Sequence, residues 1–145
     1  MPEKKVLEKA KRDLRQGKSP STAAGEFVKE EIEHVREGKH GARSTKQAIA
    51  IGLSKARRAG IPLAAPKRGK TSQSTRRSAQ RDLAKGQGTP KPPSRKRSRA
   101  ALHALQGESK QTASSAALSR QAKSVAARRR RATRAAKPKA RSASA

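Results

Sequence analysis

Large apolar side chains are concentrated between Met1 and Leu63 of this chain, and this asymmetry limits how much of it can fold. Beyond Leu63 the large aliphatic side chains are only Leu83, Leu102, Leu105, Leu118 and Val125. Burying so few cannot offset a backbone ordering cost of about 1–2 kcal/mol per residue. We therefore expect a small all-α domain of two or three short helices over residues 1–63. A long polybasic tail, mostly disordered or conditionally helical, should follow over residues 64–145.

Three segments of the domain repeat apolar residues at the spacing of an amphipathic α-helix, and they are residues 3–16, 23–37 and 44–59. The third begins with a capping box formed by Ser44 and Gln47, and Gly60 followed by Pro62 supplies its stop signal. In the tail, glycines and prolines separate two further segments that can become helical, at residues 72–85 and 110–135. The second of these is rich in alanine, but we expect it to fray until phosphates relieve the repulsion among its arginines.

The helix expected at residues 44–59 carries apolar residues on two sides. Ile49 and Leu53 share one face with Gly52. A glycine in mid-helix costs about 1 kcal/mol against alanine, so Gly52 predicts a close helix crossing. Ile51 falls on the opposite face, among basic residues. Either a second element covers Ile51, or Ile51 belongs to a docking contact with a partner.

Positive charge dominates the composition, with 38 Lys and Arg against 10 Asp and Glu and a net charge of +28. The expected domain, residues 1–63, carries a net +7 and the remainder a net +21. Such charge favours binding to phosphates, because released counterions give affinity with little sequence preference. In the domain, the candidate nucleic-acid contacts are Arg43, Lys46, Lys55, Arg57 and Arg58. In the tail, they are Arg76, Arg77, Arg95, Lys96, Arg97, Arg99, Arg128, Arg129, Arg130, Arg131, Arg134 and Lys137.

Four glutamates recur at helical spacing on the second helix and form an acidic stripe, defined by Glu26, Glu30, Glu33 and Glu37. One interpretation is a solvated face paired with nearby lysines. The alternative is a docking or masking surface, in which the stripe holds the basic third helix or the tail until nucleic acid competes for it. Both interpretations stay open at this stage.

Residues suited to catalysis or metal binding are sparse. The chain has three histidines and no cysteine, so a structural zinc would need carboxylates in unusual geometry, and we expect neither a metal site nor a cofactor. Gly69-Lys70-Thr71 matches the end of a phosphate-binding loop, but Ala64 stands where that motif needs glycine. No nucleophile, base and orienting residue can be assembled, which argues against an enzyme. The longest aliphatic run is too short to span a bilayer.

Residues 23–63, which begin Ala23-Ala24-Gly25-Glu26-Phe27 and end Gly60-Ile61-Pro62-Leu63, resemble a bacterial domain of unknown function. That domain occurs in small, basic proteins whose tails are rich in Ser, Ala, Lys and Arg. The resemblance implies a bacterial, cytosolic origin, and it carries over no functional residues. In composition, Thr89-Pro90-Lys91-Pro92-Pro93 and the Ala/Lys/Arg-rich end also resemble linker-histone tails.

The leading interpretation is a non-enzymatic DNA-binding protein of the cytoplasm, nucleoid-associated and histone-like. An RNA-binding or ribosome-associated protein would use the same phosphate electrostatics. A protein-interaction adaptor, or a self-associating protein, would instead bind its partner through the helical domain and use the tail only for localisation. We expect no membrane partner.

Overall fold

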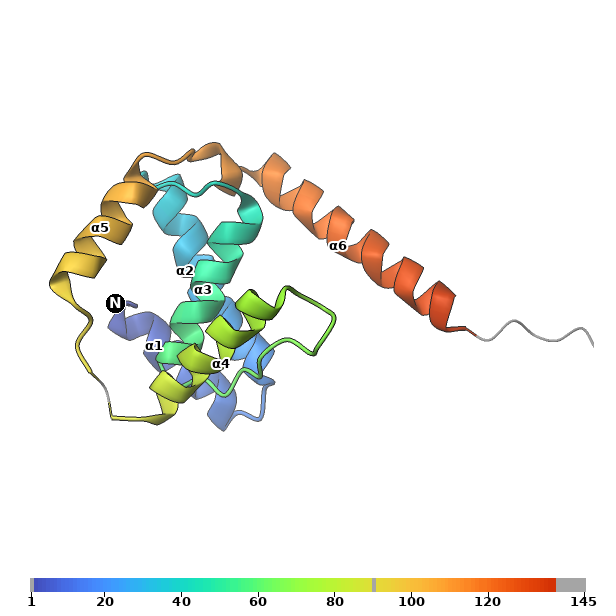
Figure 1. The fold of residues 1–145 in the computed structure, drawn as a ribbon, viewed down its shortest axis with the longest axis horizontal. Coiled ribbons are helices and arrows are strands. Elements are labelled where there is room, and N and C mark those ends of the chain that lie inside the picture. The colour runs from blue at the N-terminus through green and yellow to red at the C-terminus, as the bar shows by residue number, and fades with distance from the viewer. Residues whose placement is uncertain (1, 90, 138–145) are drawn as a thin grey trace, which may run out of the picture.

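The computed structural model describes residues 2–89 and 91–137, and this part contains six α-helices and one 3₁₀ turn (Figure 1). The helices are α1 (Lys4–Arg15), α2 (Pro20–Arg36), α3 (Thr45–Arg58), α4 (Gln73–Gln87), α5 (Arg95–Gln106) and α6 (Ser115–Ala136), and the 3₁₀ turn η1 is Gln111–Ala113. The all-α class predicted from the sequence is therefore confirmed. Residue 90 and residues 138–145 of the predicted tail lie outside the described residues.

The first three helices match their predicted segments closely, and hydrogen-bonded caps set the starts of α2 and α3. α2 begins at Pro20, earlier than the predicted residue 23, because the side chain of Ser19 accepts a hydrogen bond from Thr22 N at 3.2 Å. Proline suits the first helical position, where an N–H would have no partner within the helix. Ser44 caps α3 as predicted and accepts a hydrogen bond from Gln47 N at 3.2 Å.

The core is built around α2, which packs against both α1 and α3 (Figure 1). One apolar cluster lies before residue 64 and contains the buried Ala10, Ala23, Ala24, Phe27, Ala56 and Ile61. A second cluster contains the buried Ile32, Val35, Ala42, Ala48 and Ala113, and Leu118 packs against it. Phe27, the only Phe, Tyr or Trp in the sequence, is fully buried in the first cluster, so it cannot stack on nucleic-acid bases.

The crossing of α2 and α3 is tight at Gly52, as the position of this glycine in mid-helix predicted. A Cβ atom on Gly52 would lie 2.6 Å from Val28 Cα and 2.9 Å from Val28 N, distances that would force α2 to move. On another side, α4 packs against α3. Ile51, which an isolated α3 would expose, is half-buried, and this agrees with coverage by a second element.

Contacts cross the predicted domain boundary at residue 63, and most of the described tail is helical rather than disordered. Ala79 of α4 and Ala113 of η1 are 5% and 0% exposed. Gly41 N donates a hydrogen bond to Leu105 O at 2.7 Å, which ties the end of α5 to the loop between α2 and α3. Disorder was expected because the tail has few large aliphatic side chains. The tail packs instead through small alanines and backbone hydrogen bonds, which that argument did not consider.

One tail helix, α5, forms where no helix was predicted. Four cations, Arg95, Lys96, Arg97 and Arg99, occupy its first turns, where positive charge opposes the helix dipole. Helix-favouring residues follow them from Ala100 to Leu105, and α5 buries none of its residues. The predicted segment 110–135 is divided into η1 and α6, because Ser114 caps a new helix by accepting a hydrogen bond from Ala117 N.

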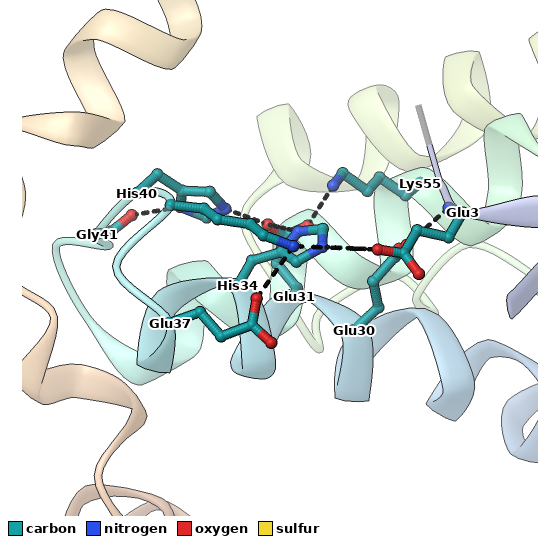
Figure 2. A network of polar contacts seen from close by, with 9 residues as sticks. Glu3, Glu30, Glu31, His34, Glu37, His40, Gly41 and Lys55 are labelled. Carbon is teal, nitrogen blue, oxygen red and sulfur yellow. Dashed lines mark hydrogen bonds and ion pairs between the residues drawn. The ribbon is translucent and has the colours of Figure 1, made fainter.

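A buried polar network joins α2 to α3 and to the loop between them (Figure 2). Glu31 of α2 is 1% exposed, and its Oε2 lies 2.6 Å from Nζ of Lys55 on α3. Its Oε1 lies 2.5 Å from His40 Nε2, while His40 Nδ1 donates to Gly41 O at 2.9 Å. A buried carboxylate costs several kcal/mol unless it is paired, so the fold depends on these partners of Glu31.

Gly52→Ala should lower the free energy of unfolding by about 1–3 kcal/mol, although alanine favours a helix by about 1 kcal/mol, because the new methyl group collides with the backbone of α2. Denaturant titration followed by circular dichroism measures this change. Gly25→Ala is the matched control in α2. A Cβ there meets nothing within 4 Å, so this change should raise stability by about 0.5–1 kcal/mol. Equal stabilisation by both substitutions would contradict the tight crossing.

Ala113→Glu should lower the free energy of unfolding by about 2 kcal/mol or more, because it places an unpaired carboxylate in the second apolar cluster. Ala116→Glu makes the same change at an exposed position of α6 and should stay within about 0.5 kcal/mol of the wild-type value. Thermal and denaturant unfolding of both variants test whether the packed unit extends past residue 63. Similar small effects from the two changes would support the predicted boundary instead.

Candidate nucleic-acid interface

Among the described helices, α6 carries the most lysines and arginines, and it leaves the packed helices at its N-terminal end and runs outward as a single helix (Figure 1). Successive residues of a helix are about 100° apart around its axis. Six exposed cations of α6 therefore fall on one half of its circumference, and we call them the basic face of α6: Arg120, Lys123, Arg128, Arg130, Arg131 and Arg134. Arg129 falls on the opposite half, with Leu118 and Val125.

The local sequence explains why α6 forms in spite of its charge. Its N-terminus is capped by Ser114 and anchored by Leu118, which packs against the second apolar cluster. Its alanines have high helix propensity. Arg134 lies in the last turn of the helix, where positive charge interacts favourably with the helix dipole. The anchored end fixes α6 to the rest of the protein, and the charged end projects from it.

The cations of α4, α5 and α6 are not neutralised by acidic side chains within the described residues. In that part of the chain, the Lys and Arg side chains that form ion pairs are Lys9, Lys18, Lys29, Lys39, Arg43, Lys55 and Arg58. All of them precede residue 59. The predicted tail contacts are exposed except for the half-buried Arg76. No Asp or Glu follows Glu108 in the sequence.

Three of the five cations predicted as contacts in the domain are accessible. Lys46 is exposed near the start of α3. The side chain of Arg43 is 81% exposed, and its Nε lies 3.7 Å from Glu108 Oε1. The side chain of Arg58 is 48% exposed, and its Nε lies 3.8 Å from Asp82 Oδ1. Exposed ion pairs at these distances contribute little stability, so a phosphate can compete with them.

Lys55 and Arg57 do not fit the contact role predicted for them. Lys55 is held by the buried Glu31 carboxylate in the polar network. Arg57 is 7% exposed, and its guanidinium donates hydrogen bonds to Leu63 O at 3.1 Å and Ala64 O at 3.2 Å. Burial lowers the pKa of Arg57 from its ordinary value, and the charge of Asp82 partly opposes that shift. Both cations stabilise the fold instead of facing solvent.

The acidic stripe on α2 is divided between a solvated part and a buried part. Three of its glutamates pair with lysines close by: Glu26 with Lys9 at 2.9 Å, Glu33 with Lys29 at 4.0 Å and Glu37 with Lys39 at 3.0 Å. The hydrogen bond and the charge of Glu26 raise the pKa of Lys9. The fourth, Glu30, is 4% exposed and accepts a hydrogen bond from Glu3 N at 2.7 Å. Pairing with local lysines agrees with the solvated-face interpretation for the first three.

An open cavity of about 570 Å³ lies where the start of α3 meets η1 and α6. Lys46 and Arg120 both line it, together with the hydroxyl groups of Ser44, Thr45 and Thr112. The cavity therefore brings a predicted domain contact next to the basic face of α6. A single polyanion can engage both helices here.

Two members of the basic face, Arg120 and Lys123, were not predicted as contacts. The prediction relied on runs of adjacent cations such as Arg128 to Arg131. The signal that would have found the missing pair is periodic: Arg120, Lys123, Arg131 and Arg134 recur at i, i+3, i+11 and i+14, which places them on one side of a helix.

No known protein family matches this chain, and neither a curated protein nor a solved structure is found to be similar to it. The resemblance of residues 23–63 to a bacterial domain of unknown function therefore stays an expectation. Within residues 2–89 and 91–137, no helix combines the length and the apolar character needed to cross a bilayer.

Proposed function

We propose that this chain is a non-enzymatic, nucleoid-associated protein that binds duplex DNA with little sequence preference, chiefly through the basic face of α6. The observation that carries the proposal is that these six cations are exposed and form no ion pair within the described residues. Each one that neutralises a phosphate releases a condensed counterion, and that release favours binding whatever the base sequence.

A single projecting helix suits DNA better than double-stranded RNA. The major groove of B-form DNA is about 12 Å wide and admits an α-helix, whereas that of A-form RNA is too deep and narrow for side chains to read. From Arg120 to Arg134 the helix extends about 21 Å, a length over which duplex DNA carries about 12 phosphate charges. Every cation of the basic face can therefore find a phosphate.

The packed helices supply a second, weaker contact in this proposal. Lys46 lines the same cavity as Arg120, and Arg43 and Arg58 are accessible just before α3 and at its end. These three cations orient the helical body on the DNA while α6 provides most of the affinity. Base readout has no part in the proposal, because phosphate contacts position a protein on DNA without carrying sequence information.

The association constant for duplex DNA should fall steeply as salt rises. If about 10 phosphates are neutralised, the slope of log K against log salt should be near −9. Fluorescence anisotropy titrations at several salt concentrations measure it. A slope shallower than about −3 would contradict binding driven by the tail. Double-stranded RNA of equal length should bind more weakly, and equal or tighter binding of RNA would favour the RNA-binding alternative.

Replacing Arg128, Arg130, Arg131 and Arg134 with glutamine should weaken DNA binding and make the salt slope shallower by about 3–4, because four counterion-releasing contacts are lost. The matched control removes the same charge from exposed cations of α1 that form no ion pair within the described residues, by changing Lys4, Lys5, Lys11 and Arg15 to glutamine. Its slope should change by less than about 1. Equal losses in the two variants would show that net charge, and not the basic face of α6, determines binding.

A further inference from the structure

We propose that Glu31, His34 and His40 bind a single zinc ion. Glu31 and His34 lie three residues apart on α2, and His40 follows in the loop that leads to α3 (Figure 2). A carboxylate oxygen and one ring nitrogen from each histidine lie within 4.8 Å of one another. Two imidazoles and one carboxylate form a known protein ligand set for zinc, with water at the fourth position.

Both histidines have their second nitrogen next to a group that can orient the ring. His40 Nδ1 donates to Gly41 O at 2.9 Å, because a carbonyl can only accept, and Nε2 makes a hydrogen bond of 2.5 Å with Glu31 Oε1, whose proton a zinc ion would displace. His34 places Nδ1 4.0 Å from Glu31 Oε1 and Nε2 3.8 Å from Glu3 Oε1. Ligating histidines in metal sites usually donate their other N–H to a carbonyl or carboxylate, as His40 does to Gly41 O, whereas His34 Nε2 lies beyond hydrogen-bond distance of Glu3 Oε1.

The charge balance of the network also favours a cation. Glu30 and Glu31 are 4% and 1% exposed, and within the described residues Lys55 is the only lysine or arginine that pairs with either. Oε2 of Glu30 is buried and has no hydrogen-bond partner among residues 2–89 and 91–137. Glu30 also belongs, with Glu3 and His34, to a second group of converging ligand atoms. Lys55 pairs with Glu31 alone, so among the described residues the buried Glu30 carboxylate has no lysine or arginine partner, and a divalent ion beside the two carboxylates supplies the missing charge.

The donor atoms of Glu31, His34 and His40 would have to move only slightly to reach the separations found in a tetrahedral zinc site. A tetrahedral ion with ligands at about 2.0–2.1 Å holds its donor atoms about 3.3 Å apart. The separations of Glu31 Oε1 from His40 Nε2 and from His34 Nδ1 are 2.5 Å and 4.0 Å, on either side of that value. Calcium and magnesium prefer sites made of oxygen atoms, so two imidazole nitrogens select the zinc class of ions.

A zinc ion at this position would fasten the loop between α2 and α3 to α2. That loop carries Gly41 and Ala42, whose backbone N–H groups donate to Leu105 O and Ser109 O in the tail. The inference concerns the stability of the helical body and is independent of the proposed DNA binding. It is tested without nucleic acid.

The test uses the full chain, freed of metal by a chelator and titrated with Zn²⁺ in a calorimeter. One ion should bind per chain and raise the midpoint of thermal unfolding. His34→Gln and His40→Gln should each weaken binding by at least about tenfold. His103→Gln, on an exposed residue of α5, is the control and should bind as the wild type does. Absence of zinc binding, or equal affinity in all three variants, would overturn the proposal and leave a proton-bridged contact between His40 and Glu31.

A second variant keeps the proposal falsifiable if the histidine changes prevent folding. Lys55→Met removes the only lysine paired with Glu31 within the described residues and should lower the unfolding midpoint in zinc-free buffer. Zinc should restore that midpoint, and should bind more tightly than to the wild type, because the ion replaces the lost charge and no longer meets a neighbouring cation. Lys29→Met, at an exposed lysine of α2, should show neither effect. Failure of zinc to restore the Lys55→Met variant would contradict the site.

Discussion

The contact between α2 and α3 is the interaction on which the rest of the structure depends. At Gly52 the two backbones are so close that no side chain fits between them, and Lys55 of the same helix neutralises the buried Glu31 of α2. These two features act together, because a buried carboxylate is tolerated only when its partner is held in place. The contact fixes the position of α3. The other elements that pack against α3, namely α4, η1 and α6, are positioned through it. The placement of the charged helix therefore follows from close backbone packing at a glycine.

The helices before residue 64 were predictable because their signals are local. Ser44 and the 3.6-residue period of apolar side chains act within one helix, so they can be read without knowing the fold. The behaviour of the tail was not predictable by the same means. Ala79 and Ala113 become buried only because other elements approach them closely. Gly86 likewise permits a close approach of two backbones, because a Cβ there would lie 1.9 Å from Arg57 O. Small residues give a weak hydrophobic signal, although close backbone packing depends on them.

The candidate sites show the same division between local and tertiary information. Composition alone predicts phosphate as the ligand, which remains a proposal, and the structure adds which cations of α6 are exposed. The sequence could not show which cations of α3 are exposed to solvent, because Lys55, Arg57 and Arg58 look equivalent in it. Only the tertiary structure shows that other elements cover Lys55 and Arg57. The sequence predicts no metal site, because the chain has three histidines and no cysteine, and the proposed zinc ligands Glu31, His34 and His40 are brought together only by the fold. Counting residue types could not show that the turn after α2 brings His40 back against Glu31.

The distribution of ion pairs explains how a chain with ten acids and 38 cations can keep its tail available. If the acidic stripe bound the tail, each contact would have to be broken before phosphate could bind. Instead, Glu26, Glu33 and Glu37 pair with lysines of α1, α2 and the following loop, the buried Asp13 pairs with Lys18, and the buried Glu31 is held within the polar network. Exposed pairs of this kind contribute at most about 1 kcal/mol to stability, yet they occupy the carboxylates that would otherwise attract the arginines. The helical body therefore neutralises most of its own negative charge, and the basic face of α6 has no strong intramolecular competitor for phosphate among the described residues.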